Sequence, residues 1–238
     1  MWFLRAVCNT VNLYLHLYWQ TVDQQLNIAL RKVSAAATAK KDPKMDNKLI
    51  NYFLRITNLS VNELNVLIES MVIKEYPKGS FLVKEGQFYT DTYFVLEGCI
   101  RQFKIIDGND ITTNFFTEEQ WIISNELTEI KSQSDYNLQC IEDSSVVIGN
   151  EQKAQEIFKQ FPHLEIISRK IMETVFLEQQ RFLTTYITDK PEQRYLNLLK
   201  SRPDIFQRVP QYDIATYIGV KPESLSRIRK KLHLKKQS

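Results

Sequence analysis

The sequence predicts an α+β protein in which an antiparallel β-roll with flanking helices is followed by a long helix and a helix-turn-helix. Apolar residues recur at helical spacing before residue 73 and after residue 150. Residues 73–149 instead carry short apolar runs, rich in β-branched and aromatic side chains, between turn residues. Five of the six glycines fall at or next to the ends of these runs. The 238 residues, 43% of them hydrophobic, suffice for a packed core and exclude a globally disordered chain.

Residues 1–44 are predicted to be an upstream extension and linker, with Met45 as the natural start. Residues 2–19 are largely apolar, but Arg5 and polar residues such as Asn12 interrupt them. No run therefore reaches the roughly 18–20 apolar residues that a membrane span needs. The stretch also lacks the apolar region and cleavage site of a secretory signal. We expect no membrane partner, and a peripheral membrane anchor is the alternative.

Cysteine and histidine usage gives no sign of a metal or redox site. Three cysteines without a C-x-x-C pair argue against a disulfide framework, a zinc ribbon or a four-cysteine iron–sulfur site. We therefore expect a cytoplasmic protein that has no cofactor and no metal and is not an enzyme, because no triad or Walker motif is present either. The residues concerned are Cys8, Cys99 and Cys140, the last two expected in the core, and the dispersed His16, His163 and His233.

Two helices are expected before the roll, at residues 46–56 and 61–73. Ser60 and Glu63 have the spacing of a capping box at the start of the second. Within the roll, Asp107-Gly108-Asn109-Asp110 is a hairpin signal between two strands. The expected strands lie near residues 80–83, 93–96, 99–106, 111–116 and 137–148.

A short helix at residues 151–161 is followed by a long helix that Pro162 opens and that runs to about Ile187. Its apolar residues form two stripes, so it needs two partners: its own roll and a second copy of the chain. The alternative is a single broad core face. The first stripe has nearly the spacing of a coiled-coil seam and is assigned to a homodimer interface. That stripe contains Ile167, Ile171, Val175 and Phe182; the second contains Ile166, Met172, Phe176 and Leu183.

Residues 211–228 match a helix-turn-helix. Ala215 supplies the small residue where two helices cross, and Gly219 supplies the left-handed turn four positions later. Pro222 then lies in the first turn of the second helix, where its missing N–H costs nothing. The alternative is an ordinary helical hairpin with a solvated cationic face. Inward-facing apolar residues are expected at Ile214, Ile218, Val220, Leu225, Ile228 and Leu232.

Charge is unevenly distributed behind a net charge of only +3. Residues 190–238 hold 12 basic and four acidic side chains, whereas residues 45–189 hold 13 basic and 22 acidic ones. A basic end on an acidic body suggests that this end meets a polyanion. The second helix would present Arg and Glu to base edges, and Lys and Ser to phosphates. The candidate DNA-binding residues are Gln211, Tyr212, Lys221, Glu223, Ser224, Arg227, Lys230 and Lys231.

Residues 46–238 resemble the Crp/Fnr family of bacterial transcription regulators, in a form similar to members from Bacteroidetes-type bacteria. Residues 78–86, 93–101 and 136–144 are similar to the β-roll of cyclic-nucleotide-binding domains, and residues 211–228 to the family's helix-turn-helix. The resemblance implies a homodimeric, sequence-specific regulator on an inverted-repeat operator in double-stranded DNA. RNA polymerase is a candidate further partner.

The resemblance also implies roles on the second helix. Glu223 and Arg227 match the family's base-contacting glutamate and second arginine, and Ser224 matches its phosphate-gripping hydroxyl. Pro222 replaces the first arginine, so the operator preference of the best-known members does not transfer. The family continues into a two-stranded wing, whereas this sequence ends soon after Leu234. We therefore expect a winged-helix-like domain with a truncated wing.

The effector pocket that the resemblance implies is degenerate. Cyclic-nucleotide-binding members hold the cyclic phosphate with an Arg-Ser/Thr-Ala triplet, because the fixed negative charge needs a bidentate partner. Here no arginine lies between Arg101 and Arg169, and Asp135 would repel a phosphate. We expect no tight binding of cyclic AMP or cyclic GMP, and an unknown small-molecule effector or none. The pocket positions are Ser124, Asn125, Glu126, Ser134, Asp135 and Tyr136.

The predicted organisation has four segments. They are an N-terminal extension at 1–44, a β-roll sensor domain at 45–161, a dimerisation helix at 162–188, and a DNA-binding domain at 189–238. A sensing or protein-interaction module whose helix-turn-helix no longer binds DNA is the alternative function.

Overall fold

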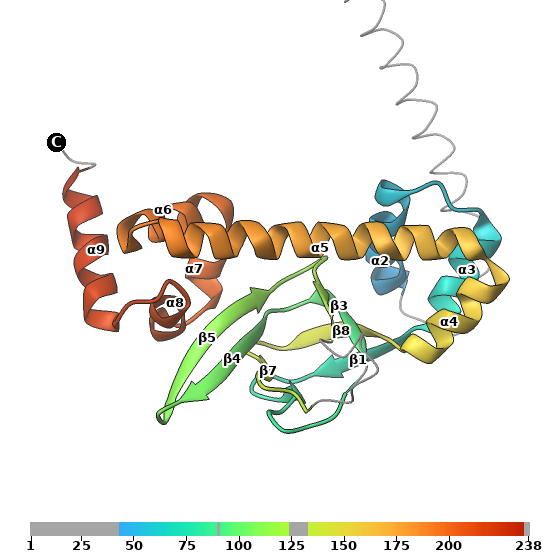
Figure 1. Cartoon of the computed structure of the whole chain (residues 1–238), viewed down its shortest axis with the longest axis horizontal. Coiled ribbons are helices and arrows are strands. Elements are labelled where there is room, and N and C mark those ends of the chain that lie inside the picture. The colour runs from blue at the N-terminus through green and yellow to red at the C-terminus, as the bar shows by residue number, and fades with distance from the viewer. Residues whose placement is uncertain (1–42, 90, 124–132, 236–238) are drawn as a thin grey trace, which may run out of the picture. The chain divides into compact units, whose positions relative to one another are not determined.

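The computed structural model describes residues 43–89, 91–123 and 133–235 (Figure 1). The chain divides into two compact units, residues 1–68 and 69–238. Helix α2 covers Pro43–Ile56, so the last residues of the expected linker are helical; the rest of the expected extension lies outside the described residues. No helix in the described ranges combines the length and the apolarity needed to cross a bilayer.

Helix α3, Val61–Ser70, begins with the predicted capping box. The Ser60 N–H donates to Glu63 Oε2 at 2.8 Å, and the Glu63 N–H donates to Ser60 Oγ at 3.4 Å. The helix ends earlier than residue 73, where the sequence predicted its end. Val72 and Ile73 instead start strand β1, because their β-branched side chains suit the pairing with Ile148 and Val147 that the sheet offers.

Antiparallel strands form the predicted roll in two four-stranded sheets. One sheet has the order β1-β8-β3-β6 and the other β2-β7-β4-β5. An apolar cluster with members from both sheets fills the roll, including Val83, Val95, Leu138 and Val146. The strands are β1 Val72–Tyr76, β2 Phe81–Val83, β3 Thr92–Glu97, β4 Ile100–Ile106, β5 Asn109–Phe116, β6 Trp121–Ile122, β7 Asn137–Cys140 and β8 Ser144–Gly149.

The hairpin between β4 and β5 turns where the sequence predicted, but its loop has only two residues, because Asn109 and Asp110 already belong to β5. Asp107 and Gly108 both have positive φ, 51° and 75°, and Ile106 pairs with Asn109. Two positive φ angles are what a type I′ turn requires. The second strand of this hairpin, β5, packs against α8 (Figure 1).

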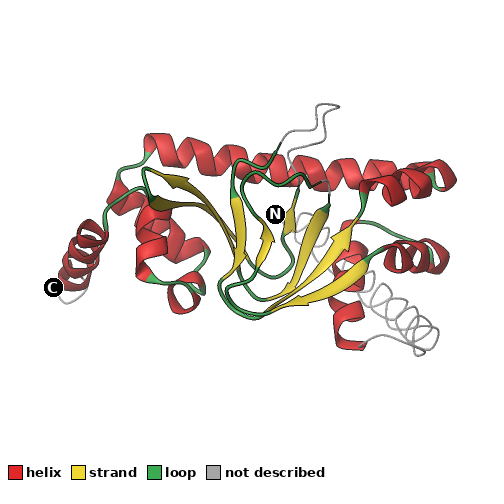
Figure 2. Cartoon of the chain, turned by 90° about the horizontal axis from the view of Figure 1, so that it is seen from below, coloured by secondary structure: helices red, strands yellow, loops and turns green. Residues whose placement is uncertain are grey.

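Six helices follow the roll in the described residues, and those predicted from the sequence begin at or near their predicted starts. Proline opens three of them, α5, α6 and α9, as expected for a residue without an N–H. Figure 2 shows α5 as one unbroken helix that runs past the strands of the roll. The helices are α4 Glu151–Gln160, α5 Pro162–Thr188, α6 Pro191–Ser201, α7 Ile205–Arg208, α8 Gln211–Tyr217 and α9 Pro222–Lys235.

The turn between α8 and α9 closes on Gly219, as predicted, with a φ of 71°. The Gly219 N–H donates to the Thr216 carbonyl at 3.0 Å, and the Val220 N–H donates to the Ala215 carbonyl at 2.9 Å. These two bonds define a Schellman motif. A Cβ on Gly219 would also lie 2.4 Å from the hydroxyl of Tyr186, near the end of α5. The turn thus needs glycine for its backbone conformation and for its contact with α5.

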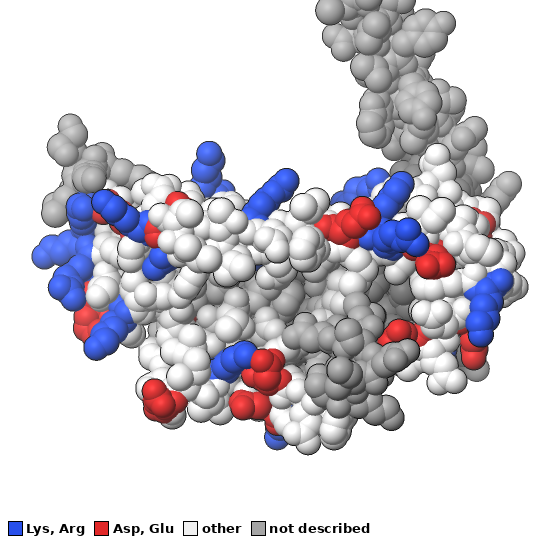
Figure 3. Space-filling model, viewed as in Figure 1, with Lys and Arg blue, Asp and Glu red and all other residues white. Residues whose placement is uncertain are grey.

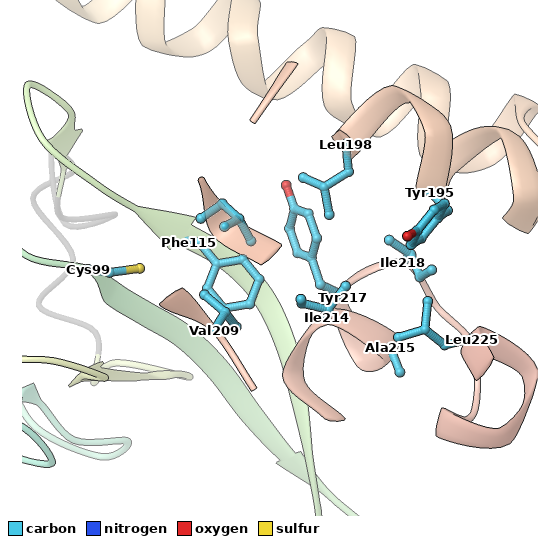
Figure 4. Packing of buried hydrophobic residues seen from close by; sticks show 11 residues of the cluster. Cys99, Phe115, Tyr195, Leu198, Val209, Ile214, Ala215, Tyr217, Ile218 and Leu225 are labelled. Atoms are coloured by element: carbon cyan, nitrogen blue, oxygen red, sulfur yellow. The ribbon is translucent and has the colours of Figure 1, made fainter. Parts of the chain in front are cut away.

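Helices α6 to α9 share one hydrophobic core with the roll (Figure 4). The Phe115 ring of β5 lies 5.1 Å from the Tyr217 ring of α8. On α5, Phe182 stacks on Tyr217, also at 5.1 Å. Tyr217 therefore connects three parts of the fold. The buried members of this core are Cys99, Phe115, Tyr195, Leu198, Ile205, Val209, Ile214, Ala215, Tyr217, Ile218 and Leu225.

A buried ion pair joins the roll to α8 beside this core. Arg101 of β4 is 5% exposed, and its Nη2 lies 3.1 Å from Asp213 Oδ1 on α8. Its Nη1 lies 3.2 Å from Asp110, and its Nε donates to Thr112 Oγ1 at 2.9 Å. The Thr112 N–H donates to Thr216 Oγ1 at 3.2 Å. Burial raises the pKa of Asp213, and the Arg101 charge opposes that rise.

Replacing Asp213 with Asn should destabilise the protein, because the buried Arg101 cation then keeps only the partly exposed Asp110. We expect the free energy of unfolding to fall by about 3 kcal/mol, measured by urea denaturation. Asp204→Asn is the matched control, since Asp204 pairs with Arg208 at 3.6 Å but is exposed. The control should change stability by less than about 1 kcal/mol. Equal losses in both variants would contradict the role given to the buried pair.

Replacing Gly219 with Ala should cost more than the same change at Gly108. Both residues have positive φ, but a Cβ on Gly108 meets nothing within 4 Å. Gly108→Ala should therefore lower the free energy of unfolding by only the conformational cost, about 1–2 kcal/mol. Gly219→Ala adds the clash with Tyr186 and should lower it further, measured by thermal and urea denaturation. A loss at Gly219 no larger than that at Gly108 would show that Tyr186 moves aside freely.

Candidate nucleic-acid interface

The second helix of the helix-turn-helix, α9, has one packed face and one cationic face. Leu225 is 1% exposed, and Ile228 and Leu232 pack against the shared core, as the sequence predicted for all three. The opposite face is exposed and predominantly basic. Its exposed charged residues, with Lys221 just before the helix, are Lys221, Glu223, Arg227, Lys230 and Lys231; Arg229 is also exposed but lies beside the packed stripe, four residues after Leu225.

The predicted DNA-contacting residues lie at the surface of this motif. Gln211 and Tyr212 begin α8, and Tyr212 is 44% exposed. Ser224 is half-buried in the first turn of α9. Within the described part of the chain, the Arg227 guanidinium makes only long contacts in its own helix, 3.4 Å to the Glu223 carbonyl and 3.4 Å to Ser224 Oγ. Its side chain can therefore extend toward a ligand at little cost.

Lys231 differs from the other predicted cations because, among the described residues, it forms a salt bridge with another helix. Its Nζ donates to Glu192 Oε2 of α6 at 2.6 Å. Lys230, its neighbour, is exposed and forms no salt bridge among the described residues. Figure 3 shows Lys and Arg side chains gathered over α9, whereas acidic side chains are more frequent over the roll.

Arg194 of α6 holds the turn before α9 in place, a role that the sequence did not suggest. Its Nε donates to the Ile218 carbonyl at 2.8 Å. Its Nη1 donates to the carbonyls of Tyr186 and Asp189, at 2.9 and 2.8 Å. The guanidinium also lies 4.7 Å from the centre of the Tyr186 ring. One side chain thus ties the end of α5 to the turn of the helix-turn-helix.

Arg208 of α7 is also directed inward, to the roll. It contacts both carboxylate oxygens of Glu118 at 2.9 Å and forms a second salt bridge with Glu142. Burial by itself would raise the pKa of Glu118, but hydrogen bonds from Arg208 and from the Gly98 N–H hold it below its usual value. The predicted basic end therefore contains arginines that stabilise the chain, and a count of charges could not separate them from those on α9.

The predicted effector positions that are described do not form an anion site. Tyr136 is 4% exposed, and its hydroxyl contacts that of Tyr89, whose ring stacks on Tyr93 at 6.4 Å. Burial raises the pKa of Tyr93, so its hydroxyl stays neutral. Ser134 Oγ donates to the Tyr136 carbonyl at 2.8 Å. Among the described residues, tyrosine side chains and apolar groups line this part of the roll.

Asp135 lies outside this interior, exposed and paired with Lys104. Arg101, the last arginine before Arg169 in the sequence, extends to α8. The other predicted pocket positions, Ser124, Asn125 and Glu126, lie outside the described residues.

The two apolar stripes of α5 have different exposure. Of the four residues assigned to a homodimer, Ile167 is buried, and Ile171, Val175 and Phe182 are half-buried within the same chain. Their assignment to an interface between copies stays a prediction. The other stripe is mostly exposed, although its Met172 is half-buried. Exposed apolar residues of α5 on that side are Ile166 at 54%, Phe176 at 61%, Leu177 at 53%, Leu183 at 52% and Ile187 at 73%.

Comparison with known proteins identifies the roll. Residues 73–161 match the family model of the cyclic nucleotide-binding domain. A search of curated protein sequences finds no significant match.

Solved structures are similar to this chain over the helices as well as over the roll. The c-di-GMP-responsive global regulator CLP of Xanthomonas campestris is 15% identical, with a TM-score of 0.59 over 74% of this chain and 93% of its own. A protein described as a transcriptional regulator of the Crp/Fnr family from Eubacterium rectale is 16% identical, with a TM-score of 0.59 over 78% and 88%. FixK2 of Bradyrhizobium japonicum is 17% identical, with a TM-score of 0.56 over 69% and 85%.

The antiparallel roll, the long helix α5 and the helix-turn-helix occur here in the order that the sequence predicted. The similarity to Bacteroidetes-type members stays a prediction. Residues 73–161 therefore match the cyclic nucleotide-binding domain, and the chain shares the fold of these solved structures, one of which is described as a Crp/Fnr-family regulator.

Proposed function

We propose that the protein is a sequence-specific transcription regulator that binds double-stranded DNA as a homodimer on an inverted-repeat operator. The observation that carries the proposal is the cationic face of α9. It is displayed by a turn that Gly219 closes and that Arg194 ties to α5. A helix held in this way can enter a major groove as a rigid element.

The chemistry of the exposed residues supports a division of roles. The Arg227 guanidinium offers a fork of hydrogen-bond donors, and the Glu223 carboxylate offers an acceptor. Groups of both kinds read base edges in the major groove. Lys221 and Lys230 are exposed cations suited to phosphates, and these contacts set position rather than sequence. Lys231 would have to exchange Glu192 for a phosphate, so it contributes less to binding than Lys230.

The exposed stripe of α5 supports the homodimer. Leucine, isoleucine and phenylalanine side chains that are more than half exposed along one helix favour pairing with an identical helix. Such pairing about a two-fold axis would place two copies of α9 on half-sites one helical turn apart, ~34 Å. We propose this stripe, which lies on the opposite face of α5 from the seam predicted from the sequence, as the interface. We further propose that the protein does not bind a cyclic nucleotide tightly, because the described pocket positions offer tyrosine hydroxyls and Asp135 rather than an arginine.

Replacing Arg227 and Lys230 separately with Ala tests the DNA-binding role. Arg227→Ala should weaken binding to the operator by about 1–3 kcal/mol and relax the choice of base. Lys230→Ala should weaken binding to all sequences alike and reduce the salt dependence. Fluorescence anisotropy with operator and random duplexes, at several salt concentrations, measures both effects; genome-wide mapping of bound sites supplies the operator.

Lys159→Ala, an exposed lysine on α4, is the control and should leave both affinities unchanged. Equal losses of both variants on operator and random DNA would refute the division of roles. A wild-type chain that shifts no genomic DNA at physiological salt would instead favour a sensing module without DNA-binding activity.

Replacing Leu183 with Glu tests the homodimer, because a charge at an interface between copies must be desolvated. We expect the variant to sediment as a monomer and to lose operator affinity by more than about tenfold, since one half-site is then bound at a time. Ile105→Glu is the matched control: Ile105 is 54% exposed and lies on β4, away from α5. A dimer that survives Leu183→Glu would contradict the proposed interface.

A further inference from the structure

A cavity of about 730 Å³ lies between the second half of α5, the β5–β6 part of the roll, and helices α6 and α8. Its volume falls within the range of small-molecule sites, about 300–1,000 Å³. The lining includes none of the predicted effector positions and none of the predicted DNA-contacting residues. The lining does include Val175 and Phe182, two of the four residues that the sequence assigned to a homodimer interface. The cavity is therefore distinct from the predicted effector pocket and DNA surface, but it overlaps that predicted seam.

Aromatic side chains from four elements line the cavity. Phe116 and Trp121 come from the roll, Phe182 and Tyr186 from α5, and Tyr217 from α8. Phe182 is stacked on Tyr217 with their planes 19° apart, and Trp121 is only partly buried. Such walls offer faces and edges to a flat aromatic ring.

The charged lining is mainly positive. It contains Arg181, Arg194, Lys200 and Arg202, against one exposed carboxylate, Glu178. Within the described residues, none of these four cations forms a salt bridge. The field of the cations is therefore focused in a recess with apolar walls, where it attracts an anion.

Two of these cations are held by hydrogen bonds to neutral oxygen atoms, which do not neutralise their positive charge. Arg202 donates to the Phe115 carbonyl at 2.8 Å and to Thr117 Oγ1 at 3.0 Å. Arg194 donates only to backbone carbonyls. Arg101 and Arg208, outside the cavity, are by contrast neutralised by carboxylates. The cations of the cavity thus keep their positive charge, whereas carboxylates neutralise the other arginines between the roll and the C-terminal helices.

We propose that this cavity binds an aromatic anion, that is, a small molecule with a flat ring and a carboxylate or phosphate group. The ring would lie among Trp121, Phe182 and Tyr217, with its anionic group toward Arg181 and Lys200 at the rim. Because the lining includes Tyr186 and Ile218, which Arg194 connects, the ligand would act on the turn before α9. This inference does not depend on DNA binding.

Isothermal titration of the full-length protein with 2-naphthoate, compared with the neutral 2-naphthylmethanol, tests the site. We expect one 2-naphthoate site per chain, and binding of the neutral compound that is at least about tenfold weaker, or 1.4 kcal/mol. Binding should also quench tryptophan fluorescence, and Trp121→Phe should remove that quenching. No binding of 2-naphthoate, or equal binding of the two compounds, would overturn the proposal.

Charge reversal locates the site. Arg181→Glu combined with Lys200→Glu should weaken 2-naphthoate binding by at least about tenfold. The matched control is Lys159→Glu combined with Lys170→Glu, two exposed lysines that do not line the cavity. Circular dichroism checks that both double variants are folded. Equal affinities of the two double variants would place the bound anion elsewhere and overturn the assignment.

Discussion

The buried ion pair between Arg101 and Asp213 determines how the roll and the helix-turn-helix fit together. The backbone of Arg101 is fixed in β4 by strand pairing on both sides, with β5 and with β7. A carboxylate must therefore lie next to the position at which the strand holds the guanidinium. Leaving a buried cation without its carboxylate is costly, and α8 brings the carboxylate. The aromatic contacts of Tyr217 with Phe115 and Phe182 follow from this docking. The position of α9 is thus set by contacts with the roll and α5 as well as by its own turn.

This arrangement gives a change in the roll or in α5 a short physical route to α9. The β4–β5 hairpin contacts α8 directly, and the end of α5 contacts the turn through Tyr186 and Arg194. Both routes consist of packed side chains and hydrogen bonds with defined partners, which is the kind of contact that carries coupling between sites. The cavity between α5, the roll and α6 is lined by residues of these contacts, including Tyr186 and Arg194.

The charge of the C-terminal end serves two purposes. Arg208 and Lys231 pair with carboxylates, and Arg194 and Arg202 donate to neutral oxygens, so these four hold the fold together. The remaining exposed cations of α9 face outward and form the candidate DNA surface. A net charge of +3 therefore conceals two populations of basic residues, which differ in what surrounds them rather than in where they occur in the chain.

The sequence by itself determined the features that depend on neighbouring residues. These include the capping box at Ser60, the Asp107-Gly108 hairpin, the proline at the start of α5 and the turn at Gly219, because each follows from local backbone or side-chain geometry. Only the tertiary structure decided which stripe of α5 is buried, which arginines face inward, and that a cationic cavity forms between α5 and the roll. These depend on segments far apart in the chain, whose contacts no local pattern encodes.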